Sequence, residues 1–382
     1  MHQKYGPVVR VAPGYFSIST PDKTVYGIGS KFHKGDWYQA WKHPSPDRWT
    51  MFPDQDIKRH AETRKRFQSL YSMSSLLTYE PYVDECVELF LDKLSQFARE
   101  GTSIDLAHWF QCYAFDVIGS ITYSERFGFL DKGEDVAGTI AALDKSMAYS
   151  TLVGIFPKLH PYLYAVLEKI PNSGAAGRTY LMNFVTRKIS ERNSGKVEPR
   201  VDIAGPQDFL EKMTRAHNLD PDKTLPYHIF MMALSNIIAG ADTTAISLSS
   251  TLHHLLTSPH TLAKLRNELL THGFATRTPS FKDTQTLPYL QAVIKESLRL
   301  HPATGLPLWR VVPDCGVMIG DYYVPPGSNV GVNAWVSHHD EEVFGKDACV
   351  FRPERWMQLN SSQRKDMEDA YMPVRPIPSP PN

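Results

Sequence analysis

Cysteine is scarce in this chain of 382 residues. The four cysteines, Cys86, Cys112, Cys315 and Cys349, are scattered, and no two have the Cys-x-x-Cys spacing of a zinc or redox site. A disulfide framework is equally unsupported, because small secreted domains carry their cysteines at high density. A reducing compartment is the simpler inference.

Long uninterrupted apolar segments are also missing. No run of eighteen apolar residues occurs, so the sequence predicts no membrane-spanning helix. The start, Met1-His2-Gln3-Lys4, does not resemble a signal peptide. The 41 basic and 41 acidic residues cancel, so no overall field favours a nucleic-acid partner. As written, the chain is expected to be cytoplasmic and to bind no nucleic acid.

What is present is an ordinary globular composition, with 42% hydrophobic and 21% charged residues. A chain of this length can bury a large core, as one domain or two. Periodicity predicts a mainly helical protein with a small β-region. The predicted helices cover 58–71, 80–100, 105–123, 134–151, 180–194, 225–256, 259–270 and 287–301, and the predicted strands lie at 8–12, 15–19 and within 316–332.

The most unusual stretch is 236–244, Asn-Ile-Ile-Ala-Gly-Ala-Asp-Thr-Thr, inside the apolar region 225–256. Gly240 costs about 1 kcal/mol relative to alanine in a helix interior. The following Asp and two Thr residues compete for backbone hydrogen bonds. Two interpretations are open at this point. The stretch is a kinked buried helix whose threonines bond back to their own turn, or a helix that lets a flat ligand approach its backbone.

Two further motifs follow in order along the chain. Glu296-Ser297-Leu298-Arg299 lies in a predicted helix, and Phe351-Arg352-Pro353-Glu354-Arg355-Trp356 lies in a predicted loop. Each motif is common singly, but the ordered set resembles the cytochrome P450 family from about Tyr5 to Met372. The resemblance implies the cytochrome P450 fold, as one domain over 1–373 that is incomplete at both ends.

The resemblance implies catalytic roles for Asp242 and Thr243. The hydroxyl would order water, and the carboxylate behind it would feed protons to the oxygen that is being activated. Ala239 and Gly240, being small, would leave room for dioxygen next to a haem. Thr244 would be structural.

Three residues would hold the haem propionates by the same resemblance. His60 and Arg64 lie four residues apart and share a helix face, and a guanidinium binds a carboxylate at two points. Arg310 matches a family arginine with the same task. From residue type alone, His60 and Arg64 would instead belong to an ordinary solvated face.

A structural triad is implied for Glu296, Arg299 and Arg355. Glu296 and Arg299, three apart on one helix, can pair, and Arg355 would complete the Glu–Arg–Arg cluster of the family. In most proteins such a motif is an exposed pair worth about 0.3–0.5 kcal/mol. A buried cluster costs several kcal/mol when one partner is removed.

Substrate-contacting residues are placed by family position only. They are Trp37, Phe52, Asn236, Ala239 and the segment 303–308. The aromatic stretch 31–56 would form the loop over the distal pocket, or else a surface loop pinned by aromatic packing. The apolar, proline-broken stretch 152–166 would belong to the roof of the cavity.

The match stops after Ala370-Tyr371-Met372-Pro373. In the family a glycine-rich loop with the haem-ligating cysteine follows, but here 374–382 contains four prolines in nine residues and cannot build that loop or its helix. None of the four cysteines has such a setting. We therefore predict no metal ligand in this sequence, an aberrant proline-rich tail at 374–382, and a truncated product or an erroneous gene model that lacks the last helix.

The resemblance implies a haem-thiolate monooxygenase in the complete form. It would bind haem b, receive electrons from NADPH through an NADPH-cytochrome P450 reductase, and oxidise a small apolar organic substrate. Segments 4–10 and 110–129 look most like fungal pisatin-demethylase-like P450s, many of which act in secondary metabolism. The complete form would sit on the endoplasmic reticulum membrane through an N-terminal anchor absent here. The alternative is a non-catalytic remnant without iron ligation, and a generic helical scaffold would leave three ordered motifs unexplained.

Overall fold

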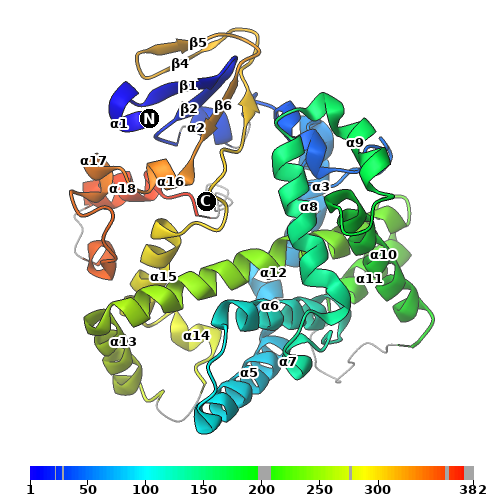
Figure 1. Cartoon of the computed structure of the whole chain (residues 1–382), viewed down its shortest axis with the longest axis vertical. Coiled ribbons are helices and arrows are strands. Elements are labelled where there is room, and N and C mark those ends of the chain that lie inside the picture. The colour runs from blue at the N-terminus through cyan, green and yellow to red at the C-terminus, as the bar shows by residue number, and fades with distance from the viewer. Residues whose placement is uncertain (22, 28–29, 197–207, 275–277, 358–360, 374–382) are drawn as a thin grey trace. The chain divides into compact units, whose positions relative to one another are not determined.

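The computed structural model describes the chain except for residues 22, 28–29, 197–207, 275–277, 358–360 and 374–382. Two compact units are present. The first combines Met1–Gly35 with Ser247–Asn382, and the second is Asp36–Ile246. Helices predominate in both (Figure 1). The predicted tail at 374–382 and most of the predicted linker at 196–207 lie outside the described residues.

The first unit contains the predicted β-region. In its described residues the strands are β1 (Val8–Ala12), β2 (Tyr15–Ile18), β3 (Arg310–Val311), β4 (Val317–Ile319), β5 (Tyr322–Val324) and β6 (Asn329–Val332). β1 and β2 form the predicted antiparallel hairpin around Pro13-Gly14, where Gly14 supplies a φ of 71°. β2 pairs parallel with β6, and β6 pairs antiparallel with β3. β4 and β5 form a separate hairpin.

Besides a core that packs strand residues against Val25 and Tyr26, the first unit has two small cores, which lie among its helices. These helices are α1 (His2–Tyr5), α2 (Lys23–Tyr26), α13 (Pro259–Thr271), α14 (Phe281–Thr284), α15 (Pro288–Leu300), α16 (Ala334–Ser337), α17 (Glu341–Phe344), the 3-10 helix η5 (Pro353–Trp356) and α18 (Ser361–Ala370). One core packs Trp356 against Phe344, and the other packs Val293 against Leu265. α15 takes part in both cores, so its position organises this part of the unit.

The second unit is helical throughout its described residues. It contains η1 (Asp36–Trp41), α3 (Ile57–Phe67), η2 (Gln68–Tyr71), α4 (Met73–Leu77), α5 (Glu80–Glu100), α6 (Leu106–Tyr123), α7 (Phe129–Lys132), η3 (Val136–Gly138), α8 (Thr139–Val153), η4 (Pro157–Leu159), α9 (His160–Leu167), α10 (Gly174–Asn193), α11 (Phe209–Leu219) and most of α12 (Pro226–Thr257). Its main core is one large apolar cluster, and a smaller cluster packs Tyr149, Tyr164 and Ala175 together. Stacked aromatic pairs such as Phe115–Phe129, 4.9 Å between ring centroids, hold helices together within the main core.

α12 is the long helix that the apolar region predicts, and it continues without interruption through Gly240. It is also the one helix in the described part of the chain that is long and apolar enough to cross a membrane. Half of its most apolar window is buried inside the protein. The core helix of a soluble protein passes the same test of length and composition as a membrane-spanning helix.

Several helix boundaries differ from those expected. The predicted helix at 134–151 begins only at Thr139, because Ala137 has a φ of 56° and Gly138 a φ of 73°. α10 begins at Gly174 rather than at 180, since the Ser173 side chain accepts the Ala176 N–H and caps it earlier. α11 and α18 were not predicted. α11 has 11 residues and buries Phe209, Leu210 and Met213 on one face, whereas α18 has 10 residues and buries only Met367 and Ala370.

α8 and α10 pack closely because α10 carries glycine at the crossing. A Cβ placed on Gly177 would lie 2.5 Å from the Ala142 carbonyl oxygen. That distance is far inside van der Waals contact, so the two backbones could not keep their approach with any larger residue. Gly177 is therefore required for the close packing of α10 against α8 and is not a point of flexibility.

Replacing Gly177 by alanine should lower the free energy of unfolding by about 1–3 kcal/mol, since the added methyl group forces α8 and α10 apart. Urea unfolding followed by circular dichroism measures this change. Thr186→Ala is the matched control, because Thr186 is exposed on the same helix and bonds only to its own turn. Equal stability of the two variants would show that the crossing tolerates a side chain.

Candidate active site

The predicted catalytic pair lies in the middle of α12, within the second unit. Thr243 follows Ala239 by one turn, and its hydroxyl donates a hydrogen bond to the Ala239 carbonyl at 2.7 Å. Ala239 is exposed and Thr243 is half-buried. The back-bonding expected of a mid-helix threonine is thus present, and it orients the Thr243 side chain along the same face as Ala239.

Asp242 points towards other helices of the second unit. Burial raises the pKa of its carboxyl, and a hydrogen bond with Gln111 of α6 opposes that shift. Asp144 of α8 lies near enough to interact with it: burial raises the pKa of Asp144, and the charge of Asp242 adds to the rise. The Asp242 carboxyl can therefore hold a proton at a higher pH than an exposed aspartate can.

Two other α12 residues serve packing inside the unit. A Cβ on Gly240 would collide with the Ile118 side chain of α6, so the glycine permits α6 and α12 to approach. Asn236 is buried, accepts the Tyr71 hydroxyl at 2.5 Å and donates to Thr122 at 3.0 Å. The roles of Gly240 beside a cofactor and of Asn236 beside a substrate stay predictions.

His60 and Arg64 lie on α3, four residues apart and both half-buried. α3 begins where Asp56 caps it by accepting the Arg59 N–H. Among the described residues the Arg64 guanidinium has no ion-pair or hydrogen-bond partner. A half-buried, unpaired guanidinium is suited to bind an anionic group, which is the task the sequence assigns to it.

A buried carboxylate connects the three predicted triad residues in the first unit. Glu296 accepts from the Arg299 Nε at 2.9 Å and Nη2 at 2.8 Å, and from the Arg355 Nε at 2.8 Å. Glu296 and Arg299 are completely buried. Burial disfavours the ionised carboxyl, but the hydrogen bond and charge of Arg299, followed by those of Arg355, outweigh it and hold the pKa of Glu296 below its usual value.

Further donors and acceptors complete this cluster. The Trp356 indole N–H donates to Glu296 at 2.9 Å, and the Arg352 backbone N–H does so at 3.1 Å. Arg299 donates to the His338 carbonyl oxygen at 2.5 Å. The Pro-Glu-Arg-Trp motif is a short helix, η5, that supplies Trp356 and Arg355 together and packs along α15.

Arg310, the third predicted propionate ligand, lies in β3 of the first unit. Its Nη1 donates to the carbonyl oxygens of Leu308 and Trp309, both at 3.1 Å, and its guanidinium lies 5.2 Å from the centroid of the Tyr26 ring. These contacts engage it within its own unit. Its role with a cofactor stays a prediction.

A buried polar cluster in the second unit was missed by the sequence reasoning. Arg178 of α10 donates to the carbonyl oxygens of Ala40 at 2.9 Å and Lys42 at 2.8 Å, and also to the Ser150 hydroxyl. His160 of α9 donates to the same Lys42 carbonyl at 3.0 Å. The backbone of segment 36–42 is thereby hydrogen-bonded to side chains of α9 and α10, and Arg178 also connects it to α8. No sequence motif marks such a cluster, because main-chain carbonyls are its acceptors.

Two of the predicted substrate-contacting residues, Trp37 and Phe52, differ in their exposure. Trp37 is buried, donates to the Thr151 carbonyl oxygen at 3.4 Å and packs against Gly154. Phe52 is 46% exposed, with its ring 5.3 Å from that of Tyr38. Trp37 therefore packs segment 36–42 against the end of α8. The Phe52 side chain, in contrast, is partly open to solvent.

The four cysteines differ in burial, which bears on their suitability as iron ligands. Burial raises the pKa of Cys86 to about 11 and that of Cys112 to about 12, whereas a metal ligand needs an accessible thiolate. Cys315 and Cys349 are exposed on the first unit. In the part of the chain that the structure describes, no group of three His, Cys, Asp or Glu side chains could hold a metal ion. Among the described residues Arg64 fits the anionic edge of a haem. The absence of an axial cysteine stays a prediction.

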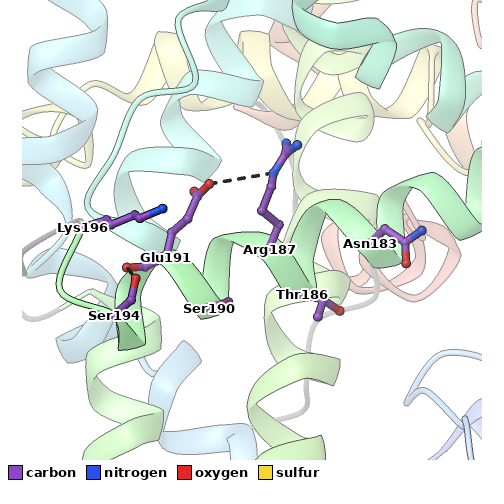
Figure 2. A pocket seen from close by; sticks show the side chains of 7 residues that line it. All are labelled: Asn183, Thr186, Arg187, Ser190, Glu191, Ser194 and Lys196. Carbon is purple, nitrogen blue, oxygen red and sulfur yellow. Dashed lines mark hydrogen bonds and ion pairs between the residues drawn. The ribbon is translucent and has the colours of Figure 1, made fainter.

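A surface hollow along the last turns of α10 is a poor candidate for a site. Figure 2 shows its lining: Asn183, Thr186, Arg187, Ser190, Glu191, Ser194 and Lys196. An ion pair of 4.0 Å joins Arg187 and Glu191 across it. The lining is polar, open and made by one helix and its end. It contains none of the predicted site residues and lacks the enclosed apolar wall that small-molecule sites have.

The mainly helical fold with its small sheets is that of a cytochrome P450. The family model of cytochrome P450 matches residues 1–373. A cytochrome P450 monooxygenase of Aspergillus terreus is 37% identical over 387 residues, covering 97% of this chain and 77% of the relative. A pisatin demethylase of Fusarium vanettenii is 38% identical over 369 residues, covering 95% of this chain and 71% of the relative.

A third relative, the cytochrome P450 monooxygenase pkfB of Emericella nidulans, is 37% identical over 366 residues, which is 94% of this chain and 71% of the relative. The match extends through both units and includes α12, α15 and η5. This chain belongs to the cytochrome P450 family. Its likeness to fungal members, pisatin demethylase among them, agrees with the resemblance read from the sequence.

Replacing Glu296 by alanine should lower the free energy of unfolding by about 3–5 kcal/mol, because two buried guanidiniums lose the carboxylate they share. Urea unfolding measures the change. Glu342→Ala serves as the control, since Glu342 is an exposed acid in the same unit, and it should stay within about 0.5 kcal/mol of the parent. Similar small losses in both variants would contradict a structural role of the cluster.

Neutral His160 should make stability depend on pH. Burial, and secondarily the charge of Arg178, lower the pKa of His160 from 6.5 to about 4. The unfolded chain binds a proton below about pH 6.5, but the folded chain does so only below about pH 4, so this stabilisation is complete above pH 6.5 and is lost as the pH falls through that window.

In the same window, His160→Gln should reduce the slope of unfolding free energy against pH by about one proton, or about 1.4 kcal/mol per pH unit. Urea unfolding at a series of pH values measures the slope. His260→Gln, at an exposed position of α13, should leave it unchanged. A parent slope retained in His160→Gln would show that His160 is not the group that titrates.

Proposed function

We propose that this chain is a haem-dependent monooxygenase that oxidises a small apolar organic molecule. The observation that carries the proposal is the adjacent placement, on α12, of a carboxyl with a raised pKa and a hydroxyl on the more open face. Oxygen insertion with release of water needs protons delivered without bulk water flooding the site. A partly buried acid next to an alcohol supplies that need.

Asp242 would hold the proton, and Thr243 would orient the water that accepts it. The Thr243 oxygen is fixed by its own donation to the Ala239 carbonyl, so a water that donates to this oxygen would have a defined position. The Gln111 contact keeps the Asp242 carboxyl directed towards α6. Removing the carboxyl should therefore slow proton delivery more than it changes substrate binding.

Haem b, when bound, supplies the activation of dioxygen. His60 and Arg64 would hold its propionates, and Ala239 would leave space beside it. Support comes from the unpaired, half-buried guanidinium of Arg64 and from the exposed, small side chain of Ala239. Electrons would come from NADPH through a cytochrome P450 reductase, as is general in the family, whose members are typically bound to the endoplasmic reticulum membrane.

The substrate class follows from the family and the relatives. Cytochrome P450 enzymes generally act on apolar substrates, and relatives of this chain include fungal monooxygenases and a protein named pisatin demethylase. We extend this to an apolar secondary metabolite as the substrate here. Phe52 and Ala239 are exposed and could contact it, whereas Trp37 and Asn236 are occupied by packing and hydrogen bonds.

The placement of the cysteines favours a second candidate, a non-catalytic haem-fold protein without a thiolate ligand. Cys86 and Cys112 are locked in the core, and Cys315 has its thiol directed to the Gly316 carbonyl oxygen at 3.4 Å. Cys349 is exposed, and this candidate requires that its thiol does not ligate iron. Such a protein would keep the haem-edge residues and lose oxygen activation.

Adding haem to the purified chain tests both candidates. Arg64→Gln should weaken haem affinity about tenfold or more, because a charge-assisted hydrogen bond to a propionate is lost. Lys65→Gln, at an exposed neighbour on α3, is the control and should change little. Absorbance titration measures the affinities, and an equal effect of both variants would remove the assigned role of Arg64.

The reduced carbon-monoxide difference spectrum then separates the candidates. A thiolate-type Soret band, with NADPH-dependent oxidation of apolar compounds in the presence of reductase, supports the monooxygenase. Haem uptake without that band supports the non-catalytic protein. A chain that takes up no haem at all would contradict both.

A further inference from the structure

The antiparallel ladder between β3 and β6 stops one hydrogen-bonded pair early. At its start the Val312 N–H donates to the Ser328 carbonyl oxygen at 2.8 Å. Two residues further along each strand, Arg310 lies opposite Val330. Directly bonded pairs recur at every second residue of an antiparallel ladder. The register therefore calls for a further bonded pair two residues beyond Arg310 and Val330.

Leu308 and Val332 would form that further pair, but a side chain lies between them. The Tyr26 hydroxyl accepts the Val332 N–H at 2.9 Å and donates to the Leu308 carbonyl oxygen at 3.0 Å. A single oxygen atom thus stands where a direct bond would close the ladder. Tyr26 ends α2 and is only 8% exposed, so water does not easily take the place of this hydroxyl.

The Tyr26 bridge lies at the root of segment 303–308, which is predicted to contact substrate. Directly after this segment, the Arg310 guanidinium lies 5.2 Å from the centroid of the Tyr26 ring. The segment also passes close to β6, since a Cβ placed on Gly331 would lie 3.0 Å from the Pro307 Cβ. Its position therefore depends on how far apart β3 and β6 are held where their ladder ends.

We propose that Tyr26 is a positioning residue for the substrate, because its hydroxyl holds β3 and β6 apart and so sets where segment 303–308 lies. A direct bond between Leu308 and Val332 would instead draw the root of the segment towards β6. Such a shift changes the room beside a bound ligand, and small differences in room discriminate between substrates. The inference rests on the proposed function, since it requires a haem-bound site that segment 303–308 borders.

Two substitutions separate the parts of the Tyr26 side chain. Tyr26→Phe keeps the ring between the strands and removes the oxygen, so the Val332 N–H and the Leu308 carbonyl lose their shared partner. Tyr26→Leu removes the ring as well, which lets the two strands pair directly. Tyr323→Phe is the matched control, because Tyr323 is 59% exposed in the same unit. Far-UV circular dichroism shows whether each variant folds.

Hydrogen exchange followed by mass spectrometry tests the bridge without haem. In Tyr26→Phe, peptides that cover 303–309 and 329–334 should exchange about tenfold faster than in the parent, because a buried hydrogen-bonded bridge is lost. A peptide from β1, in the same sheet, should exchange at the parent rate. Tyr323→Phe should leave all three regions unchanged.

Imidazoles of increasing size test the effect on a bound ligand. Imidazole, 1-phenylimidazole and 1-(4-biphenylyl)imidazole are titrated into the haem-loaded chain, and the shift of the Soret band gives each Kd. Both Tyr26 variants should change the Kd ratio of the largest probe to imidazole by about fivefold or more, since only the larger probes reach segment 303–308. The Kd of imidazole itself, and every Kd of Tyr323→Phe, should stay at the parent value.

Two outcomes would overturn the proposal by itself. Parent-like exchange of 303–309 in Tyr26→Phe would show that the hydroxyl does not hold the segment. Faster exchange with the same change in Kd for all three probes, or with none, would leave Tyr26 a structural role only. A parent chain that takes up no haem would contradict the proposed function and the positioning of a substrate with it, whereas the exchange experiment would still decide whether Tyr26 holds segment 303–308.

Discussion

The completely buried carboxylate of Glu296 is the interaction on which the first unit depends. It accepts hydrogen bonds from Arg299, Arg355, Trp356 and the Arg352 backbone. α15 and η5 are far apart in sequence, and this one group joins them. A carboxylate without its cations, or cations without the carboxylate, would be much less tolerable in this interior than the complete cluster. The cluster therefore specifies one arrangement of these elements.

In the second unit a buried guanidinium has neutral hydrogen-bond partners instead of a carboxylate. Arg178 is buried and bonds to carbonyl oxygens and a hydroxyl, and burial lowers its pKa because no carboxylate offsets the desolvation. Backbone carbonyls are oriented dipoles that remain acceptors at every pH. The attachment of the 36–42 segment to α8, α9 and α10 consequently depends on side-chain geometry and on a neutral His160, rather than on a pair of opposite charges.

The chemistry proposed for the protein centres on α12, where packing and reactivity use different sides of one helix. Gly240 and Asn236 meet α6 and other parts of the core, and Asp242 interacts with Gln111 and Asp144. Ala239 and Thr243 share a more open face. The helix can thus keep an acid partly desolvated while presenting a hydroxyl. Oxygen activation would require in addition a thiolate ligand, and the prediction that none of the four cysteines supplies it awaits the spectroscopic test.

Sequence reasoning was sufficient for the family, for the long helices and for the residues of the Glu–Arg–Arg cluster, because motif spacing and helical periodicity are local properties. The hairpin at Pro13-Gly14 was predictable for the same reason. The starts of α8 and α10 depended on left-handed residues and a serine cap that periodicity does not register. The direction of the Asp242 carboxyl, the Arg178 cluster and the Tyr26 bridge between β3 and β6 were decided by tertiary structure alone. Each depends on which distant backbone or side chain lies opposite, and that information is absent from any single stretch of the chain.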